Sequence, residues 1–391
     1  MEFDFSDIKY YEEDDLKSAL ERIVDEPTFA QICKFVEKGM SSEEAKERIL
    51  SFDKIKDFQI DFILKVIKLL INRSITKLSS ENADKLSNSN SDKYLFISNH
   101  RNIVMDAALI NHELHITFDS DFESTAIAIG NNLLGTPWIK DLARLNKSFV
   151  VIRDASVQKM LENSLKLSTY MRGLISSKKS SVWIAQREGR AKDGNDRTSP
   201  GLLKMFQMSG PKDFVENYSQ LHIIPVAISY ENDPCIISKV NELCAIELAG
   251  KFEKGPMDDF NSMYNGLMGF KGRVQINFGN EITADILKVM DEEAPRKNDK
   301  IKRLADYIDN FVHSNYKLWP KNYIATDIIN DNKQFEEFYS ADDKKAFLEL
   351  MKDKLSGINY DDKLKTKIFL QMWAVPVKNA FKNNDDYSFD F

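Results

Sequence analysis

The stretch KYLFISNHRNIVMDAAL at residues 93–109 decides the fold class of the chain. Its first part, residues 94–98, is a short apolar run typical of a buried strand. A polar turn follows, and a helix is predicted to start at Val104. A buried strand that leads through a polar turn into a helix is typical of an α/β sheet.

Further strands are predicted on the C-terminal side of this stretch, at residues 125–129, 149–152, 181–185, 223–229 and 273–278. Helices are expected at residues 155–176, between two of these strands, and at residues 297–318, after the last strand. Because strands alternate with helices, we expect an α/β fold with a mostly parallel central sheet covered by helices. Pro225, inside the strand at 223–229, indicates an edge position or an irregular turn.

The segment before the first strand is predicted to be helical. Ser41 offers an N-cap for a helix that ends at Leu50. Residues 54–78 carry apolar side chains at helical spacing with basic residues between them, which favours a core-facing bundle helix over a helix on a membrane surface. Residues 79–92 are rich in Ser, Asn and Asp and indicate a linker.

The chain becomes helical again after about Pro320, with helices expected at residues 335–356 and 362–381 and a frayed tail at 383–391. We therefore expect flanking N- and C-terminal helical segments around the sheet. The expected regions are an N-terminal helical region at 1–85, an α/β domain at 86–318 and a C-terminal helical region at 319–391.

Composition excludes several classes of protein. The chain has 391 residues, of which 42% are hydrophobic, enough for a large core. Three Cys residues cannot form a disulfide framework and lack metal-knuckle spacing, so a reducing cytoplasm is expected. The net charge of −7 argues against a general nucleic-acid binder. No stretch approaches the ~18 consecutive apolar residues of a membrane span, and the N-terminus lacks the pattern of a signal peptide.

Polar side chains follow several predicted strands at their carboxyl ends, where ligands bind in open α/β sheets. His100 follows the first strand, and Asp106 lies at the head of the next helix. A carboxylate that fixes the tautomer of an imidazole suits it to act as a general base. The alternative is a loop histidine that caps the helix. Arg153 and the cationic loop at 186–194 follow two other strands, and several cations at one sheet edge favour an anionic ligand over solvated positions.

Four blocks stand in a fixed order along the chain. They are Asn99-His100 with Asp106, the strand that closes on Arg153, Gln186-Arg187-Glu188-Gly189-Arg190, and Ile223-Ile224-Pro225-Val226. In this order they resemble the glycerolipid acyltransferase family, whose members acylate glycerol 3-phosphate or lysophosphatidic acid. The segment LGTPW at 134–138 also resembles the family pattern, and the resemblance covers roughly residues 93–282.

Two blocks depart from the family pattern. Five residues separate His100 from Asp106, where the family has four. One extra residue on an ideal helix rotates a side chain by ~100°, so the extra residue must lie in the loop, at Arg101-Asn102, for the pair to meet. No residue separates Gly189 from Arg190, where the family has one, so either Arg190 or Lys192 takes the place of the family arginine.

The resemblance implies a chemistry for the first block. His100 would take the proton of the acceptor hydroxyl as it attacks a thioester, and Asp106 would hold the imidazole and stabilise the imidazolium. Backbone N–H groups at the start of the helix at 103–114 are candidates for stabilising the oxyanion. No metal and no cofactor is expected, because acyl-CoA or acyl carrier protein is a co-substrate.

The resemblance also implies a substrate-binding set. Arg153, with Arg190 or Lys192, would bind the phosphate of the acceptor. Glu188 would bind an acceptor hydroxyl or hold the neighbouring arginine, and Gly189 belongs to the same block.

The sequence thus predicts an O-acyltransferase of phospholipid biosynthesis, moving a fatty acyl group from acyl-CoA or acyl carrier protein to glycerol 3-phosphate or lysophosphatidic acid. The expected partners are that donor, a glycerolipid acceptor and a peripheral membrane contact, without nucleic acid. The expected location is the cytoplasm, at the inner face of the membrane. Two alternatives stay open: a non-catalytic lipid- or acyl-carrier-binding protein on the same scaffold, and a helical interaction protein built from the flanking segments.

Overall fold

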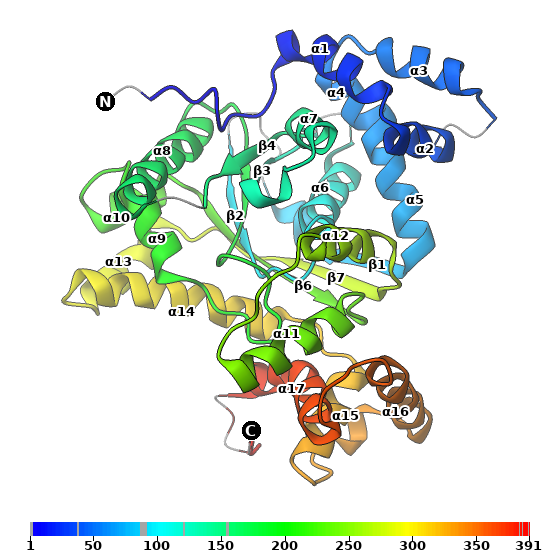
Figure 1. Cartoon of the computed structure of the whole chain (residues 1–391). Helices are drawn as coiled ribbons and strands as arrows, with labels where there is room; N and C mark the ends of the chain where they lie inside the picture. Colours follow the sequence, from blue (N-terminus) through cyan, green and yellow to red (C-terminus); the bar gives the residue numbers. More distant parts are fainter. Residues whose placement is uncertain are drawn as a thin grey trace.

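The strand, turn and helix expected at residues 93–109 lie at the centre of the structure (Figure 1). The computed structural model describes residues 3–36, 39–86, 92–119, 122–153, 156–382, 384, 386–389 and 391. Strand β2 (Leu95–Ser98) is buried along its whole length and leads through a short turn into helix α6 (Met105–Phe118).

The strands form one seven-stranded sheet with the order β1-β7-β6-β2-β5-β3-β4, so β2 occupies the middle. The other strands are β1 (Ile75–Glu81), β3 (Ala126–Gly130), β4 (Ser148–Val151), β5 (Val182–Ala185), β6 (Ile223–Tyr230) and β7 (Gly272–Phe278). Strands β6, β2, β5, β3 and β4 run parallel to one another, β7 is antiparallel to β6, and β1 is parallel to β7. The predicted mostly parallel sheet is confirmed.

Helices cover both faces of the sheet because side chains alternate along each strand. Leu95 and Ile97 of β2 belong to the core on one face, whereas Phe96 belongs to the core on the other. The first face is covered by α8 (Val157–Ser176), α9 (Pro200–Gln207), α10 (Phe214–Ser219), α13 (Ala284–Glu292) and α14 (Lys297–Asn315). The second is covered by α6 and α5 (Leu64–Ser74).

Two further cores lie beside the sheet. The N-terminal core joins α1 (Glu13–Val24), α2 (Pro27–Val36), α3 (Ser42–Leu50), α4 (Ile55–Phe58), the π-helical turn Gln59–Ile63 and α7 (Pro137–Leu145). The C-terminal core joins α11 (Ile236–Ala249), α15 (Pro320–Ile329), α16 (Ala341–Leu355) and α17 (Asp362–Phe381), at the bottom of Figure 1. Helix α12 (Asp258–Met268) follows α11 in the chain. None of the helices in the described ranges combines the length and apolar character needed to cross a bilayer.

The prediction of a helix through residue 78 and a linker from residue 79 is wrong, because residues 75–81 form β1. This strand lies at the edge of the sheet and pairs with β7 alone, so its stability comes from one backbone ladder and needs few apolar side chains. The sequence of β1 is therefore polar and lacks the apolar run by which a strand is predicted. Residues 87–91 of the expected linker lie outside the described residues. The apolar side of α5 packs into the core, which confirms the bundle-helix interpretation for residues 64–74.

Smaller differences concern helix ends and the chain terminus. The helix predicted at 335–356 begins later, because the Ser340 side chain accepts a hydrogen bond from the Asp343 N–H and caps α16. Of the helix predicted at 155–176, Ala155 lies outside the described residues, as do residues 383, 385 and 390 of the expected tail.

Pro225 lies in an inner strand, so the prediction that it marks an edge or an irregular turn is wrong. It sits inside β6, between β2 and β7, where it pairs with Ile97. Its carbonyl oxygen accepts a hydrogen bond from the Gly279 N–H, 2.8 Å away. The missing N–H of Pro225 faces the same side, one residue outside the ladder with β7, which begins at Val226.

The loop after β5 is held against the C-terminal helices at Gly194. This residue has φ +81°, and a Cβ atom there would lie 2.5 Å from the Met372 carbonyl oxygen of α17. We expect Gly194→Ala to lower the free energy of unfolding by about 1–3 kcal/mol, because it adds backbone strain and a steric clash. Gly135→Ala is the matched control, since its Cβ would meet nothing within 4 Å. Urea unfolding of both variants measures the difference, and equal stability would contradict the close approach.

Candidate active site

His100 and Asp106 lie within hydrogen-bonding distance at the carboxyl end of β2. His100 Nδ1 is 2.8 Å from Asp106 Oδ2. The extra residue between them lies in the turn, because α6 begins only at Met105. Asp106 therefore faces His100 in spite of the longer spacing. The pair has the geometry of a general base and the carboxylate that orients it.

The Asp106 carboxylate is fully buried, and hydrogen-bond donors at the carboxyl ends of β2 and β6 contact it. Its Oδ2 accepts hydrogen bonds from the backbone N–H groups of Arg101 (2.7 Å) and Asn102 (3.0 Å), and its Oδ1 accepts one from the Tyr230 hydroxyl (2.7 Å). Burial, followed by the charge of Asp106, raises the pKa of Tyr230 well above its ordinary value, so this hydroxyl stays a donor. Because Asp106 holds Nδ1 of His100, Nε2 is the nitrogen left to meet a substrate.

The rest of the His100 residue is also fixed by its neighbours. Its ring packs edge-on against Trp183 of β5, with 5.8 Å between the ring centroids. The Trp183 indole N–H donates to the Ser98 hydroxyl at 3.0 Å, and the His100 carbonyl accepts from the Ala191 N–H at 2.9 Å. The His100 side chain is 14% exposed, so it is held in place while a small part stays accessible.

The first N–H groups of α6 are engaged inside the protein. Val104 and Met105 donate to the side-chain oxygen of Asn102, at 3.3 and 3.2 Å. With the N–H groups of Arg101 and Asn102 turned toward Asp106, this end of the helix offers none of these donors to a ligand. The prediction that N–H groups at the helix start stabilise an oxyanion is wrong for these groups.

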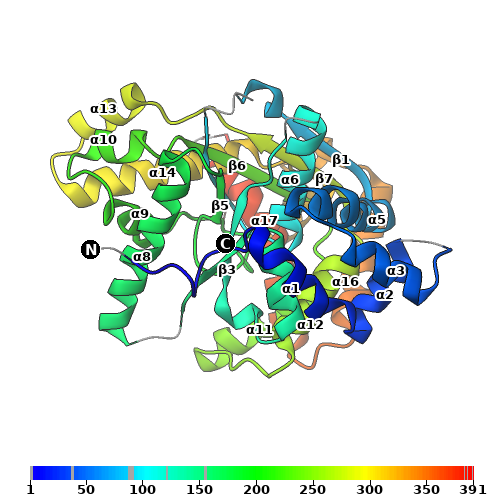
Figure 2. The same ribbon diagram turned by 90° about the horizontal axis from the view of Figure 1, so that it is seen from above.

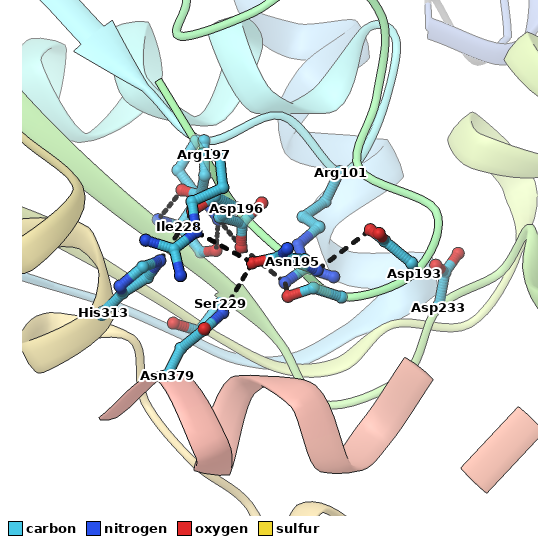
Figure 3. A network of polar contacts seen from close by, with 12 residues as sticks. Arg101, Asp193, Asn195, Asp196, Arg197, Ile228, Ser229, Asp233, His313 and Asn379 are labelled. Atoms are coloured by element: carbon cyan, nitrogen blue, oxygen red, sulfur yellow. Dashed lines mark hydrogen bonds and ion pairs between the residues drawn. The ribbon is translucent and has the colours of Figure 1, made fainter. Parts of the chain in front are cut away.

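Arg101, in the lengthened turn, points into the protein (Figure 3). Its guanidinium donates to Asp196 Oδ2 at 2.6 Å and to the Gly194 carbonyl at 3.2 Å, and it lies over the Tyr316 ring. Asn99 donates to the same Asp196 oxygen at 3.2 Å. The Arg101 and Asp196 side chains are 10% and 3% exposed, so the pair is buried. It joins the turn after β2 to the loop after β5.

The C-terminal helices hold the same loop from the other side. The His313 Nε2 group of α14 donates to the Asp196 carbonyl at 2.6 Å, and burial lowers the pKa of His313. Asn379 of α17 and Arg197 both donate to the Asn195 side-chain oxygen at 3.2 Å. Figure 3 shows these contacts meeting at residues 193–197. The candidate site is therefore supported by α14, inside the expected α/β domain, and by α17, which was expected to lie outside it.

The predicted substrate-binding residues fall into different surroundings. Arg153 Nε lies 3.5 Å from Glu188 Oε1, so the structure brings these two together, and Glu188 is 74% exposed. Lys192 instead forms an ion pair with Glu242 of α11. One terminal nitrogen of Arg190 is buried without a hydrogen-bond partner among the described residues. Gly189 has φ +72°, which suits a turn at this point.

Arg190 lies near acidic side chains at the same end of the sheet. Although burial raises the pKa of Asp233, Lys239 and more weakly Arg190 hold it below its ordinary value. Lys239 Nζ also donates to the Arg101 carbonyl at 3.2 Å. Within the described ranges, no three His, Cys, Asp or Glu side chains are grouped closely enough to hold a metal ion.

A small cavity lies behind the dyad, on the side of Tyr230. Arg101, Lys192, Tyr230, Asp233 and Tyr316 line it together with residues of α15 and α17. Its volume of about 30 Å³ has room for water but not for an acyl chain.

Comparison with known proteins finds a family model that matches the part of the chain around the candidate site. Residues 77–229, which contain all four blocks, match the family model described as Acyltransferase. They form an acyltransferase domain. This match of residues 77–229 agrees with the acyltransferase resemblance that the four blocks indicate.

No curated protein matches the sequence. Among solved structures, the chain is similar to the 1-acyl-sn-glycerophosphate (LPA) acyltransferase PlsC from Thermotoga maritima, with 12% sequence identity and a TM-score of 0.37. The alignment covers 76% of this chain and 91% of that one.

Sequence reasoning missed the residues that support the His100–Asp106 pair from behind. Tyr230 was part of the strand containing Pro225, and Asp196 lay in a polar loop, but neither has a spacing signal that links it to Asp106 or Arg101. Tyr230 and Asp106 are 124 positions apart, and Asp196 and Arg101 are 95 apart. The one available signal was the extra residue in the first block. It lengthens the turn that carries Arg101, so a buried partner for this charged side chain could have been sought.

Breaking the buried ion pair of the acyltransferase domain should cost much more stability than breaking an exposed one. We expect Asp196→Ala to lower the free energy of unfolding by about 3–5 kcal/mol, because it leaves the Arg101 charge buried without its carboxylate. Asp285→Ala is the control, because Asp285 and Lys288 form an exposed pair worth less than about 1 kcal/mol. Urea unfolding measures both, and a loss below about 1 kcal/mol for Asp196→Ala would contradict the assigned role.

Proposed function

We propose that the chain is an O-acyltransferase that moves a fatty acyl group from acyl-CoA or acyl carrier protein to a hydroxyl of glycerol 3-phosphate or lysophosphatidic acid. One observation carries the proposal: the 2.8 Å contact between His100 Nδ1 and Asp106 Oδ2, at the carboxyl edge of the sheet and inside an acyltransferase domain. The donor and the acceptor follow from the family resemblance. The proposed setting is phospholipid biosynthesis at the cytoplasmic face of a membrane.

The proposed reaction is a direct transfer. An acceptor hydroxyl has a pKa far above 7, so His100 Nε2 takes its proton while the oxygen attacks the thioester carbonyl. Asp106 stabilises the imidazolium that forms. A new C–O bond replaces the C–S bond, and the thiolate leaves readily because thiols have a pKa near ~8.5. The proton on His100 then passes to the thiolate or to water, which regenerates the base.

The arginines near the dyad support an acceptor that carries a phosphate. Arg190 has a buried guanidinium nitrogen without a hydrogen-bond partner among the described residues, and such a group gains stability when an anion supplies one. Arg153 is paired with Glu188, which is mostly exposed. Lys192 is committed to Glu242, so we assign the place of the family arginine to Arg190 rather than Lys192. Glu188 is assigned to holding Arg153, and Gly189 to the turn between the two side chains.

Thiol release tests this function directly. The wild type, supplied with palmitoyl-CoA, should release free thiol in the presence of glycerol 3-phosphate or of lysophosphatidic acid. We expect His100→Ala to lower this rate by at least about 10²-fold, because the general base is lost. Repeating the assay with palmitoyl-acyl carrier protein identifies the donor.

The control for this measurement is His222→Asn. His222 lies before β6, at the opposite end of the strand from the dyad, and is bound to Glu281. It should retain the wild-type rate. Acceptor-dependent release that survives His100→Ala would contradict the role of His100, and ligand binding by a wild type that shows no turnover would favour the non-catalytic binding protein.

Tyr230→Phe tests how the dyad is held. Removal of the hydroxyl leaves Asp106 Oδ1 without its donor, so the carboxylate orients His100 less well. We expect kcat to fall by about tenfold with KM nearly unchanged. The steady-state rates of thiol release measure both constants, with the thermal unfolding midpoint recorded in parallel. An unchanged kcat in a folded variant would show that Tyr230 does not position the dyad.

A further inference from the structure

Helix α12 carries apolar side chains on its outer face. Met257, just before the helix, is 56% exposed, and Phe260 and Tyr264 are 44% and 56% exposed. Their spacing of three and four residues places them along one stripe. The buried residues of the helix are the small Ser262 and Gly266. A surface helix of a soluble domain normally has the reverse arrangement, with its apolar residues toward the core.

The inner face of α12 is joined to the candidate active site. Asn102, whose N–H contacts Asp106, donates from its side chain to the Gly266 carbonyl at 2.9 Å. A Cβ atom at Gly266 would lie 2.8 Å from the Asn102 side-chain oxygen, so the approach is close. Asn132, directly after β3, donates to Asp259 at 2.9 Å. Helix α12 is therefore fixed beside the carboxyl edge of the sheet, on the lower side of the molecule in Figure 2.

Charged side chains of both signs lie on and around α12. Two acidic residues open the helix, and one of them, Asp259, pairs with Lys254. Helix α5, which packs against α12, bears Lys65, Lys68 and Arg73 as exposed residues. Aromatic and apolar side chains beside cations suit a surface that is anionic at its boundary and apolar beneath, which is the character of an anionic lipid layer. A tyrosine on such a stripe keeps its ring in the apolar layer and its hydroxyl among the headgroups.

We propose that α12 docks the chain on an anionic lipid surface, with Met257, Phe260 and Tyr264 inserted at the level of the headgroups. The inference rests on the proposed function in one respect: an acylated product stays in a lipid layer, so a site that makes it gains from facing one. The contact between Asn102 and Gly266 then holds the dyad at a fixed height above that surface.

Vesicle sedimentation tests the proposal. The wild type should sediment with vesicles of phosphatidylcholine and phosphatidylglycerol in equal amounts, and less with phosphatidylcholine alone. The double variant Phe260→Ser, Tyr264→Ser should bind the mixed vesicles at least about tenfold more weakly, because two apolar side chains no longer insert. Val289→Ser is the matched control, since Val289 is 54% exposed on α13, at another part of the surface, and should leave binding unchanged.

A second variant reports insertion directly. Phe260→Trp keeps the stripe apolar, so it should bind like the wild type. Its fluorescence difference from the wild type should shift to shorter wavelength when the mixed vesicles are added. An unshifted emission at a vesicle concentration that sediments the protein would place the lipid contact elsewhere and overturn the proposal.

Further outcomes separate the alternatives. A wild type that does not sediment, or a double variant that sediments equally, overturns the proposal. A wild-type dimer that the double variant dissociates would show that a second copy covers the stripe, which also overturns it. Vesicle binding needs no acyl donor, whereas thiol release with dissolved glycerol 3-phosphate needs no vesicle. Stripe-dependent binding without thiol release would therefore contradict only the proposed function, and the reverse result only the docking.

Discussion

The buried carboxylate of Asp106 is the constraint on which the candidate site depends. A charge without solvent must be met by donors, and here they come from the His100 ring, the backbone of the turn and Tyr230 of β6. The turn reaches the carboxylate only if it curls around it, and this path fixes where His100 leaves β2. Tyr230 reaches it only with β2 and β6 in their observed register. The contacts that stabilise the buried charge thus also place the candidate base.

The longer first block is accommodated by the same turn. Its additional length carries Arg101, and the guanidinium is buried against Asp196, the Gly194 carbonyl and the Tyr316 ring. A buried ion pair adds little net stability compared with apolar packing, but it is costly to break. It therefore acts mainly as a specific link between the turn after β2 and the loop after β5. Because α14 and α17 hold that loop as well, the C-terminal region takes part in shaping the site through α17.

Sequence reasoning succeeded where the signal was local and failed where it depended on distant contacts. The buried strands were predicted because each is a short apolar run, and the His100–Asp106 pair because both residues lie at the join of one strand and one helix. Strand β1 was not predicted, because an edge strand with one partner strand needs few apolar residues. The pairing of Lys192 with Glu242, 50 positions away, could not be read from the loop sequence. The outward apolar stripe of α12 was also hidden, because periodicity shows that a helix has two faces but not which face is buried.

The charges around the dyad indicate how a substrate with a phosphate group would be oriented in the candidate site. Lys192 is neutralised by Glu242, Arg153 is paired with the exposed Glu188, and one buried nitrogen of Arg190 has no hydrogen-bond partner in the described part of the chain. An incoming phosphate, under the proposed function, gains hydrogen bonds at Arg190 and takes the place of Glu188 at Arg153, because an exposed carboxylate loses little when water solvates it. Under the proposed function, the phosphate end of the acceptor is held by the loop after β5 while its hydroxyl approaches Nε2 of His100. The apolar stripe of α12 lies over the same edge of the sheet, so the arrangement suits an amphiphile with one charged end and one apolar end.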